Sequence, residues 1–151
     1  MSTTQRETNA MAYDPNNVFA KILRGELPAE RVYEDAESLA FMDIMPRCAG
    51  HTLVIPKTPA RNTLDASPAQ LAACARTVQI IARAQMKAFA AAGITIQQFN
   101  ETAGGQVVFH LHYHVMPRHD GVVLRPHSGT MEKADVLAAN AAKLRAALNS
   151  G

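Results

Sequence analysis

Cysteine, long apolar runs and clusters of like charge are all scarce in this sequence of 151 residues. Its two cysteines, Cys48 and Cys74, lie far apart and form no metal-ligating motif, so we interpret them as free thiols in a reducing cytoplasm. No apolar stretch approaches the ~20 residues that a membrane-spanning helix needs. The polar N-terminus also has no apolar core of the kind that a secretory signal requires.

Charge of either sign is equally unremarkable. The formal net charge is only +2, and no run of five basic residues occurs. Such a small excess does not by itself attract nucleic acid, so neither a nucleic acid nor a membrane is expected as a partner. Hydrophobic residues make up 48% of the chain, which is enough to bury the core of one globular domain.

The chain predicts one domain between two less regular segments. Residues 1–16 are polar and aperiodic, which predicts a disordered tail. Residues 17–120 contain the strand and helix patterns of the domain. Residues 121–151 form a C-terminal extension with an amphipathic helix over 134–148, which is expected to dock on the body of the domain or on a partner subunit.

Two helices are expected within the domain. A short helix over 18–24 ends at Gly25, a residue type common just after helices. A long helix begins with Ser67 as N-cap and Pro68 in the first turn, and it ends at Gly93. Its apolar stripe is expected to pack on a sheet. The residues of this stripe are Leu71, Ala75, Val78, Ile81, Ala82 and Phe89.

Short alternating segments predict five strands, the last of which Pro117 should stop. Mostly short loops connect them, which favours an α+β fold with an antiparallel sheet, one long and one short helix, and the C-terminal helical extension. The strands are expected at 31–34, 39–43, 51–56, 94–99 and 107–116.

The most informative segment places a histidine at every second position, at His110, His112 and His114. Side chains alternate between faces along a strand, so the three imidazoles should share one face. Imidazole serves as nucleophile, general acid or base, or metal ligand near neutral pH. Two interpretations follow: a metal site, and a metal-free catalytic or phosphate-binding site.

The metal interpretation needs ligands from other segments, for which His51, His119, His127 or a carboxylate are candidates. The metal-free interpretation gains support from the loop before the histidines, where Gly104 and Gly105 allow backbone N–H groups to approach an anion. An imidazole nucleophile could then attack phosphorus while a second imidazole neutralises the phosphate and protonates the leaving group.

The segment His-Leu-His-Tyr-His-Val-Met at 110–116 resembles the motif of the histidine triad (HIT) superfamily of nucleotide hydrolases and transferases. Similarity extends over residues 17–118 and is greatest to the Hint-like, nucleotide-binding branch, which implies a HIT-like fold. Further blocks match in the family's order, at Val18–Ile22, Gly25–Pro28, Val32–Asp35, Phe41–Ile44, Gly50–Lys57 and Gly105–Gln106.

The resemblance implies a hydrolase of purine nucleotide conjugates, either nucleoside phosphoramidates or dinucleoside polyphosphates, with a covalent nucleotidyl-histidine intermediate. It implies that His112 is the nucleophile and that His110 holds it in the reactive tautomer. His51 and His114 are then expected to contact the phosphate or the leaving group.

The resemblance also assigns a nucleotide site for an AMP- or GMP-like group and a two-fold dimer that joins two sheets. Asp43 is expected to bind the ribose hydroxyls. The side chains expected to enclose the purine are Phe19, Ile22, Phe41, Ile44 and Leu53. The residues expected to line the phosphate path are Asn100, Gly105, Gln106 and Val107.

Many relatives hold zinc through a C-x-x-C motif, a histidine after the Ile-Pro-Lys block and the first triad histidine. This chain has Asn17, Ala20 and Pro59 at the first three positions, so no metal and no other cofactor is expected. Two alternatives stay open: a purine-nucleotide binding module with little turnover, and a metal-dependent hydrolase that uses the same histidines.

Overall fold

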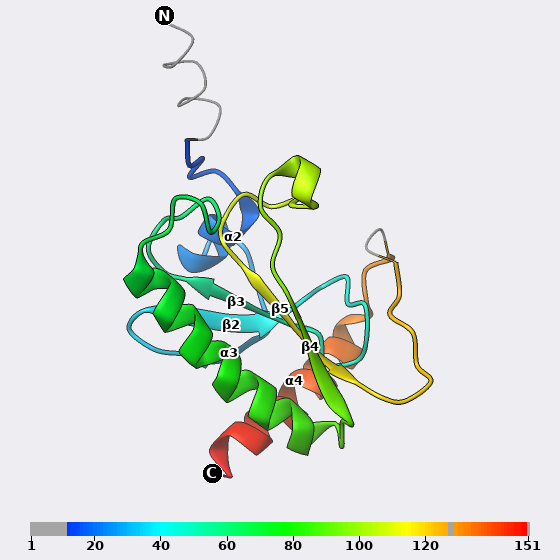
Figure 1. The fold of residues 1–151 in the computed structure, drawn as a ribbon. Coiled ribbons are helices and arrows are strands. Elements are labelled where there is room, and N and C mark those ends of the chain that lie inside the picture. Colours follow the sequence, from blue (N-terminus) through cyan, green and yellow to red (C-terminus); the bar gives the residue numbers. More distant parts are fainter. Residues whose placement is uncertain (1–11, 127–128, 151) are drawn as a thin grey trace, which may run out of the picture.

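The computed structural model describes residues 12–126 and 129–150 (Figure 1). Within these residues, five strands form one antiparallel sheet in the order β1-β2-β3-β5-β4, which confirms the predicted α+β class. The elements in chain order are α2 (Val18–Leu23), β1 (Arg31–Glu34), β2 (Ser38–Met42), β3 (Thr52–Pro56), α3 (Pro68–Ala88), β4 (Gly93–Gln97), the short 3-10 helix η1 (Thr102–Gly104), β5 (Tyr113–Arg118) and α4 (Ala134–Asn149).

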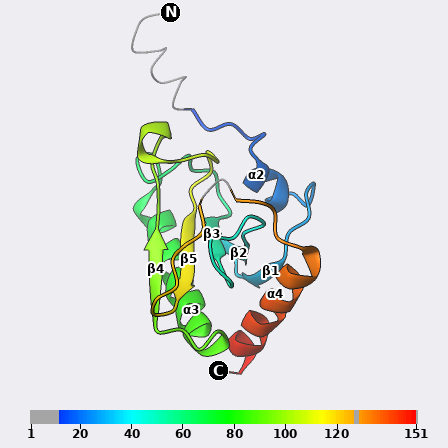
Figure 2. The same cartoon turned by 90° about the vertical axis from the view of Figure 1, so that its right-hand side faces the viewer.

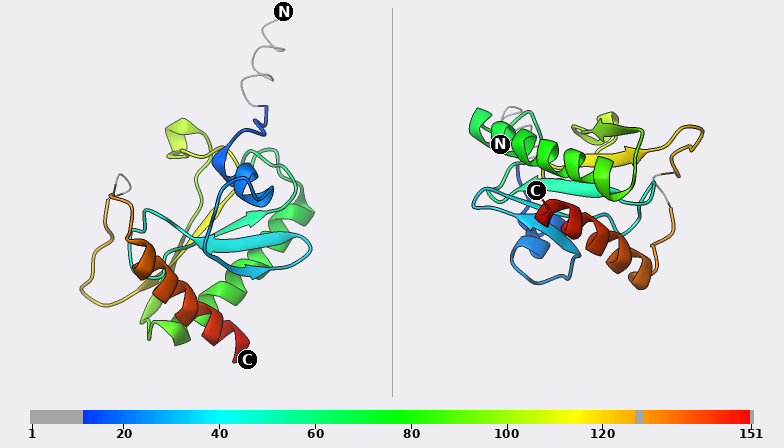
Figure 3. Two further views of the ribbon diagram at one scale, coloured as in Figure 1. Left: turned by 180° about the vertical axis from the view of Figure 1, so that it is seen from behind. Right: turned by 90° about the horizontal axis from the view of Figure 1, so that it is seen from below.

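Helix α3 runs along one face of the sheet (Figure 3), and two apolar clusters pack on the strands, one including residues of α3 and α4 and the other residues of α2. The long helix α3 packs on β2, β3, β4 and β5, and α4 lies beside α3 and over β1. Side chains of β2 and β3 alternate between the two clusters, so Ala40 and Val54 face α3 while Phe41 and Leu53 face α2. Both strands are buried along their whole length, which makes them a rigid support for the residues at their ends.

The start of α3 confirms the predicted capping. Ser67 Oγ accepts from the Gln70 backbone N–H, and the Gln70 side chain accepts from the Ser67 N–H, which completes a capping box. The predicted end at Gly93 is wrong: the helix ends at Ala88, and Gly93 begins β4. The left-handed turn is made by Ala90, at φ 48°, before the chain enters that strand.

The predicted stripe of α3 is correct at Val78 and Ile81 and wrong at Ala75, which is exposed. The buried face is shifted because it contains polar residues that an apolar pattern misses. Thr77 hydrogen-bonds the hydroxyl of Ser38 at 2.7 Å. Gln85 is fully buried and donates to the backbone carbonyls of Gly50, just before β3, and Val115 in β5.

The histidine strand is shorter than predicted. It begins at Tyr113, because the backbone of residues 110–112 bonds outside the sheet: Leu111 N–H donates to the Ala60 carbonyl at 2.8 Å. Pro117 does not stop the strand. It pairs with Ile94 of β4 and lies beyond Val115, the last residue of β5 that pairs with β3, so its missing N–H removes no bond to β3.

The C-terminal helix α4 packs on the body of the same chain, as Figure 2 shows, which is one of the two predicted locations. Leu137, Ala141 and Leu144 join the core beneath α3. Part of the predicted tail, residues 1–11, lies outside the described residues, whereas residues 12–16 form a turn against the domain. No helix among the described residues combines the length and apolar character that crossing a membrane requires.

Candidate functional site

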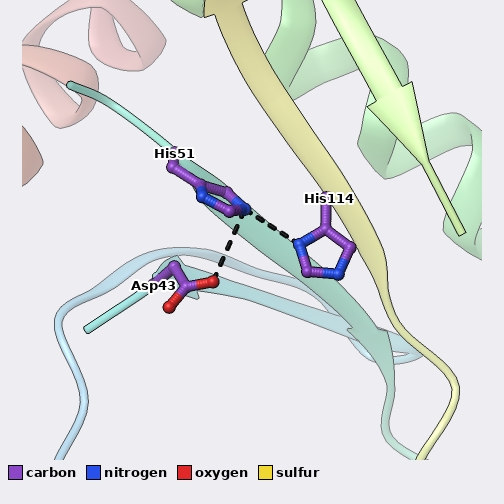
Figure 4. A group of neighbouring side chains, drawn as sticks. All are labelled: Asp43, His51 and His114. Carbon is purple, nitrogen blue, oxygen red and sulfur yellow. Dashed lines mark hydrogen bonds and ion pairs between the residues drawn. The ribbon is translucent and has the colours of Figure 1, made fainter. Parts of the chain in front are cut away.

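Three polar side chains meet where β2, β3 and β5 lie together (Figure 4). Asp43 directly follows β2, His51 directly precedes β3, and His114 lies in β5 opposite Leu53. The distance from His51 Nε2 to His114 Nδ1 is 2.9 Å, and that from His51 Nε2 to Asp43 Oδ2 is 3.5 Å. Strand pairing therefore brings together residues separated by 63 positions in the sequence.

A backbone amide assigns the protons of His51 and His114, which we call the amide-bound pair. The N–H of Arg47 donates to His51 Nδ1 at 3.0 Å, so this nitrogen has the lone pair and His51 Nε2 has the proton. His51 Nε2–H then donates to His114 Nδ1. His114 in its neutral form consequently has its proton on Nε2 and presents a hydrogen-bond donor there.

Backbone carbonyls assign the protons of His110 and His112, which we call the carbonyl-bound pair. His110 Nε2–H donates to the Pro56 carbonyl at 2.8 Å, and His112 Nδ1–H donates to the His110 carbonyl at 2.7 Å. A carbonyl only accepts, so His112 keeps its lone pair on Nε2. Burial lowers the pKa of His112 and lowers that of His110 to about 4, so both rings are neutral at pH 7.

Aromatic side chains surround the imidazoles. The ring of Phe19 meets that of His112 edge-on at 4.9 Å and that of Phe41 at 5.4 Å. The rings of His112 and His114 lie 5.0 Å apart, and Phe99 contacts His114 at 5.5 Å. Neutral, desolvated imidazoles in an apolar surround are good nucleophiles and hydrogen-bond donors toward a phosphate.

The residues predicted to enclose a purine are gathered on this face of the sheet. Phe19, Ile22, Phe41 and Leu53 belong to one buried cluster. Ile44 differs, because its side chain is 46% exposed beside Asp43. The cluster therefore forms a packed apolar surface. Ile44 is the member of the predicted set that a ligand can reach readily.

Hydrogen bonds hold the predicted phosphate loop in place, and its residues differ in the bonds that they make. Gln106 is buried, and its amide bonds Asn62, Glu101 and two carbonyls, so its side chain shapes the loop. Glu101 adopts φ 63° and is held by two bonds from Arg61, at 2.8 and 2.9 Å.

The other predicted loop residues differ in exposure and in the bonds they make. The Asn100 side chain bonds Thr63 and Gln98, and Gly105 lies at φ 100°. Val107 is 82% exposed, so a ligand can reach it. Together with the preceding bonds, these contacts fix the shape of the loop before the histidines.

Asp43 is the carboxylate of the site. Burial raises its pKa to about 6, although the Met45 N–H bond to Oδ1 at 2.9 Å acts in the opposite direction. Burying an ionised carboxylate lowers the stability of a protein, so a buried carboxylate with a raised pKa indicates a functional site more often than a stabilising one. Its two oxygens can accept from a pair of adjacent hydroxyl groups.

In both candidate metal sets, ligand atoms already have hydrogen-bond partners. At the positions of the family's zinc ligands, Asn17 caps α2 by accepting from Ala20 N–H, and the Nδ1 atom of His110 bonds the Tyr13 hydroxyl. Asp43, His51 and His114 place ligand atoms within 4.8 Å of one another. A metal on His51 Nε2 would move the imidazole proton to Nδ1, where the Arg47 N–H already points.

Four residues at the site were not anticipated from the sequence: Tyr13, Arg47, Gln85 and Phe99. Arg47 acts through its backbone, which no side-chain pattern reveals. Of the two other histidines that were considered as metal ligands, His119 contacts the Phe89 carbonyl and lies outside this cluster. His127 lies outside the described residues.

Comparisons with known proteins identify relatives of this chain in sequence and in fold. The chain matches the family model described as HIT domain over residues 24–121. The crystal structure of a Hit-like protein involved in cell-cycle regulation from Bartonella henselae, with an unknown ligand, is similar at 53% identity and a TM-score of 0.86, covering 90% of this chain and 98% of that one.

Two further relatives differ in what their names state. A Zn-bound histidine triad family protein from Mycobacterium smegmatis is 38% identical with a TM-score of 0.79, covering 89% of this chain and 94% of that one. Adenylylsulfatase HINT3 from Arabidopsis thaliana is 36% identical over 122 residues, which cover 77% of this chain and 62% of the relative. The match thus spans less than two thirds of that plant protein.

Proposed function

This chain belongs to the HIT domain family, and we propose that it hydrolyses purine nucleotide conjugates through a covalent nucleotidyl-histidine intermediate. The observation that supports this most directly is the opposite protonation of two adjacent rings. His112 presents a lone pair on Nε2, and His114 presents an N–H on Nε2, with the ring centres 5.0 Å apart. Nucleophilic displacement at phosphorus needs one group of each kind.

In the first step, His112 Nε2 attacks the α-phosphorus, and the N–P bond forms as the bond from phosphorus to the leaving group breaks. The leaving group departs with the bonding pair, accepts a hydrogen bond from His114 Nε2–H and takes a proton from solvent water. Positive charge that develops on the His112 ring is stabilised by the Nδ1–H bond to the His110 carbonyl. Water then attacks phosphorus and loses a proton to solvent as the N–P bond breaks, and the bonding pair returns to His112 Nε2 while the nucleotide is released.

The nucleotide moiety fits the apolar surface and the carboxylate beside it. In this proposal the purine packs on the Phe19 and Phe41 side with Ile44 as its exposed contact, and Asp43 accepts from the ribose hydroxyls. The loop at Gly105 and Val107 borders the phosphate. The name of the plant relative, an adenylylsulfatase, supports a nucleotidyl conjugate as the substrate class. Nucleoside phosphoramidates and dinucleoside polyphosphates are the specific candidates.

A screen of nucleotide conjugates with product analysis tests the proposal, with His112→Ala as the control. We expect AMP or GMP as product from the native protein and none from the variant. Nucleotide binding without turnover would instead identify a binding module. Stoichiometric metal, with turnover lost on chelation and restored by metal addition, would identify a metal-dependent hydrolase.

We also propose that the protein is a cytoplasmic homodimer joined through β4. This strand is an edge of the sheet, and Ile96 on it is 51% exposed. The strand Gly93–Gln97 has neither charge nor proline, the usual features that discourage edge-to-edge pairing. Ile96→Lys should shift the mass measured by light scattering to that of a monomer. A fully dimeric variant would place the interface elsewhere.

A further inference from the structure

The segment before α2 contacts His110, the more deeply buried member of the carbonyl-bound pair. The Tyr13 hydroxyl lies 2.6 Å from His110 Nδ1, and the two rings meet edge-on at 5.6 Å. Because His110 Nε2–H donates to the Pro56 carbonyl, Nδ1 has the lone pair and the Tyr13 O–H must be the donor. His110 is fully buried, so Tyr13 supplies the donor that water cannot.

Tyr13 is held in place by its own segment. Asn17 Nδ2 donates to the Asp14 carbonyl at 2.7 Å, and Arg24 donates to the Pro15 carbonyl at 2.8 Å. The following helix brings Phe19 against His112. One continuous stretch of chain therefore contacts both members of the carbonyl-bound pair, and it starts within the region that the sequence predicts to be disordered.

We propose that Tyr13 is a positioning residue that sets the geometry of the nucleophile through His110. The Tyr13 hydroxyl and the Pro56 carbonyl hydrogen-bond the two ring nitrogens of His110, and these two bonds together fix the position of the His110 backbone. The carbonyl of that same residue accepts from His112 Nδ1–H at 2.7 Å. Tyr13 thereby controls how the Nε2 lone pair of His112 is aimed, without touching the substrate.

The catalytic consequence of this role rests on the proposed function, whereas the structural consequence does not. Tyr13→Phe removes the hydroxyl and keeps the ring that packs on His110. Losing one buried hydrogen bond should lower kcat by about tenfold, because a misaimed nucleophile reaches the transition state less often. KM should stay within about twofold, since Tyr13 does not belong to the nucleotide contacts.

The experiment compares the native chain with Tyr13→Phe and with Tyr33→Phe as a matched control. Tyr33 donates its hydroxyl to Asp35 at 3.1 Å in the turn between β1 and β2, away from the histidines. Turnover of a nucleoside phosphoramidate gives kcat and KM. Nitrogen NMR of the imidazoles reports the hydrogen bonding of His110 and His112 independently of any activity.

We expect Tyr13→Phe to shift the Nδ1 resonance of His110 and the resonances of His112, and to lower kcat with KM retained, while Tyr33→Phe changes none of these. Unchanged imidazole resonances in Tyr13→Phe would overturn the inference, whatever the effect on turnover. If the native protein turns over no conjugate, the proposed function fails. Shifted His112 resonances would still establish that Tyr13 positions this ring.

Discussion

The carbonyl-bound and the amide-bound histidine pairs contain the same side chain but end in opposite chemistry. Carbonyls of Pro56 and His110 draw ring protons toward themselves and leave His112 with a basic Nε2. The Arg47 amide instead donates to the ring of His51, which in turn donates to His114 Nδ1. The proton of His114 therefore lies on Nε2. A backbone carbonyl facing His112 and a backbone amide facing His51 therefore select between nucleophile and donor.

Within the carbonyl-bound pair, replacing His112 should have the largest effect on turnover. His112→Ala is expected to lower turnover by at least about 10²-fold with every leaving group, because no other lone pair can form the N–P bond. Steady-state kinetics and trapping of the labelled intermediate measure this. His119→Ala is the matched control, since His119 lies outside the cluster, and near-normal turnover by folded His112→Ala would refute the mechanism.

Within the amide-bound pair, replacing His114 should slow turnover to an extent that depends on the leaving group. His114→Ala is expected to slow release of a basic amine by about 10²-fold, because the amine needs a donor as it departs. Release of an acidic nitrophenol should change little. Rates across a series of leaving groups provide the measurement, and an equal loss across the series would mean that His114 only binds the phosphate.

Sequence patterns anticipated the side chains of both pairs but not their protonation. Alternation placed His112 and His114 on one side, and their rings are indeed neighbours. The tautomer of His112 depends on the His110 carbonyl two residues away, whereas those of His110, His51 and His114 depend on Pro56 and on the Arg47 amide. The partners at Pro56 and Arg47 follow only from the three-dimensional arrangement of the chain, so no local pattern could predict them.

The fold shows the same division between what periodicity reveals and what it misses. Capping residues and alternating strands predicted the sheet and the start of α3 at Ser67. The buried face of that helix was misplaced, since Thr77 and Gln85 are polar residues whose burial depends on distant partners. Tyr13 stands alone in a polar stretch, and its bond to His110 spans 97 positions.

The carboxylate beside the amide-bound pair should reveal a conflict between stability and binding. Burial raises the pKa of Asp43 to about 6, so between its ordinary value and pH 6 the folded state binds more protons than the unfolded state. Stability therefore falls as the pH rises through this window. Asp43→Asn should raise the free energy of unfolding at pH 7 by about 3 kcal/mol and leave it unchanged near pH 3.

Denaturant unfolding at the two pH values measures this effect, with Asp35→Asn as the control of opposite sign. Asp35 accepts bonds from the Glu37 and Ser38 backbone amides, which hold its pKa below its ordinary value, so its loss should destabilise the protein at pH 7. Asp43→Asn should also weaken a ribonucleotide more than its 2′,3′-dideoxy analogue. Equal weakening would exclude contact between Asp43 and the ribose.

The smallest effect is expected from the support beneath the amide-bound pair. Gln85 Nε2 donates to the carbonyls of Gly50 and Val115, the residues next to His51 and His114, at 3.0 and 2.8 Å. Gln85→Met keeps the volume and leaves both carbonyls without this donor. The Oε1 atom of Gln85 is buried and has no hydrogen-bond partner among the described residues, so the substitution also removes one unsatisfied polar atom. The net loss of stability should therefore be only about 1–2 kcal/mol.

Gln79→Met, on the exposed side of the same helix, is the matched control and should change stability by less than about 0.5 kcal/mol. The loosened carbonyls should let His51 and His114 move, so Gln85→Met should slow release of an amine more than release of a nitrophenol. That is the selectivity expected of His114→Ala, in weaker form. A uniform loss across leaving groups would show that Gln85 supports both histidine pairs alike, because the carbonyl-bound pair contributes to every turnover.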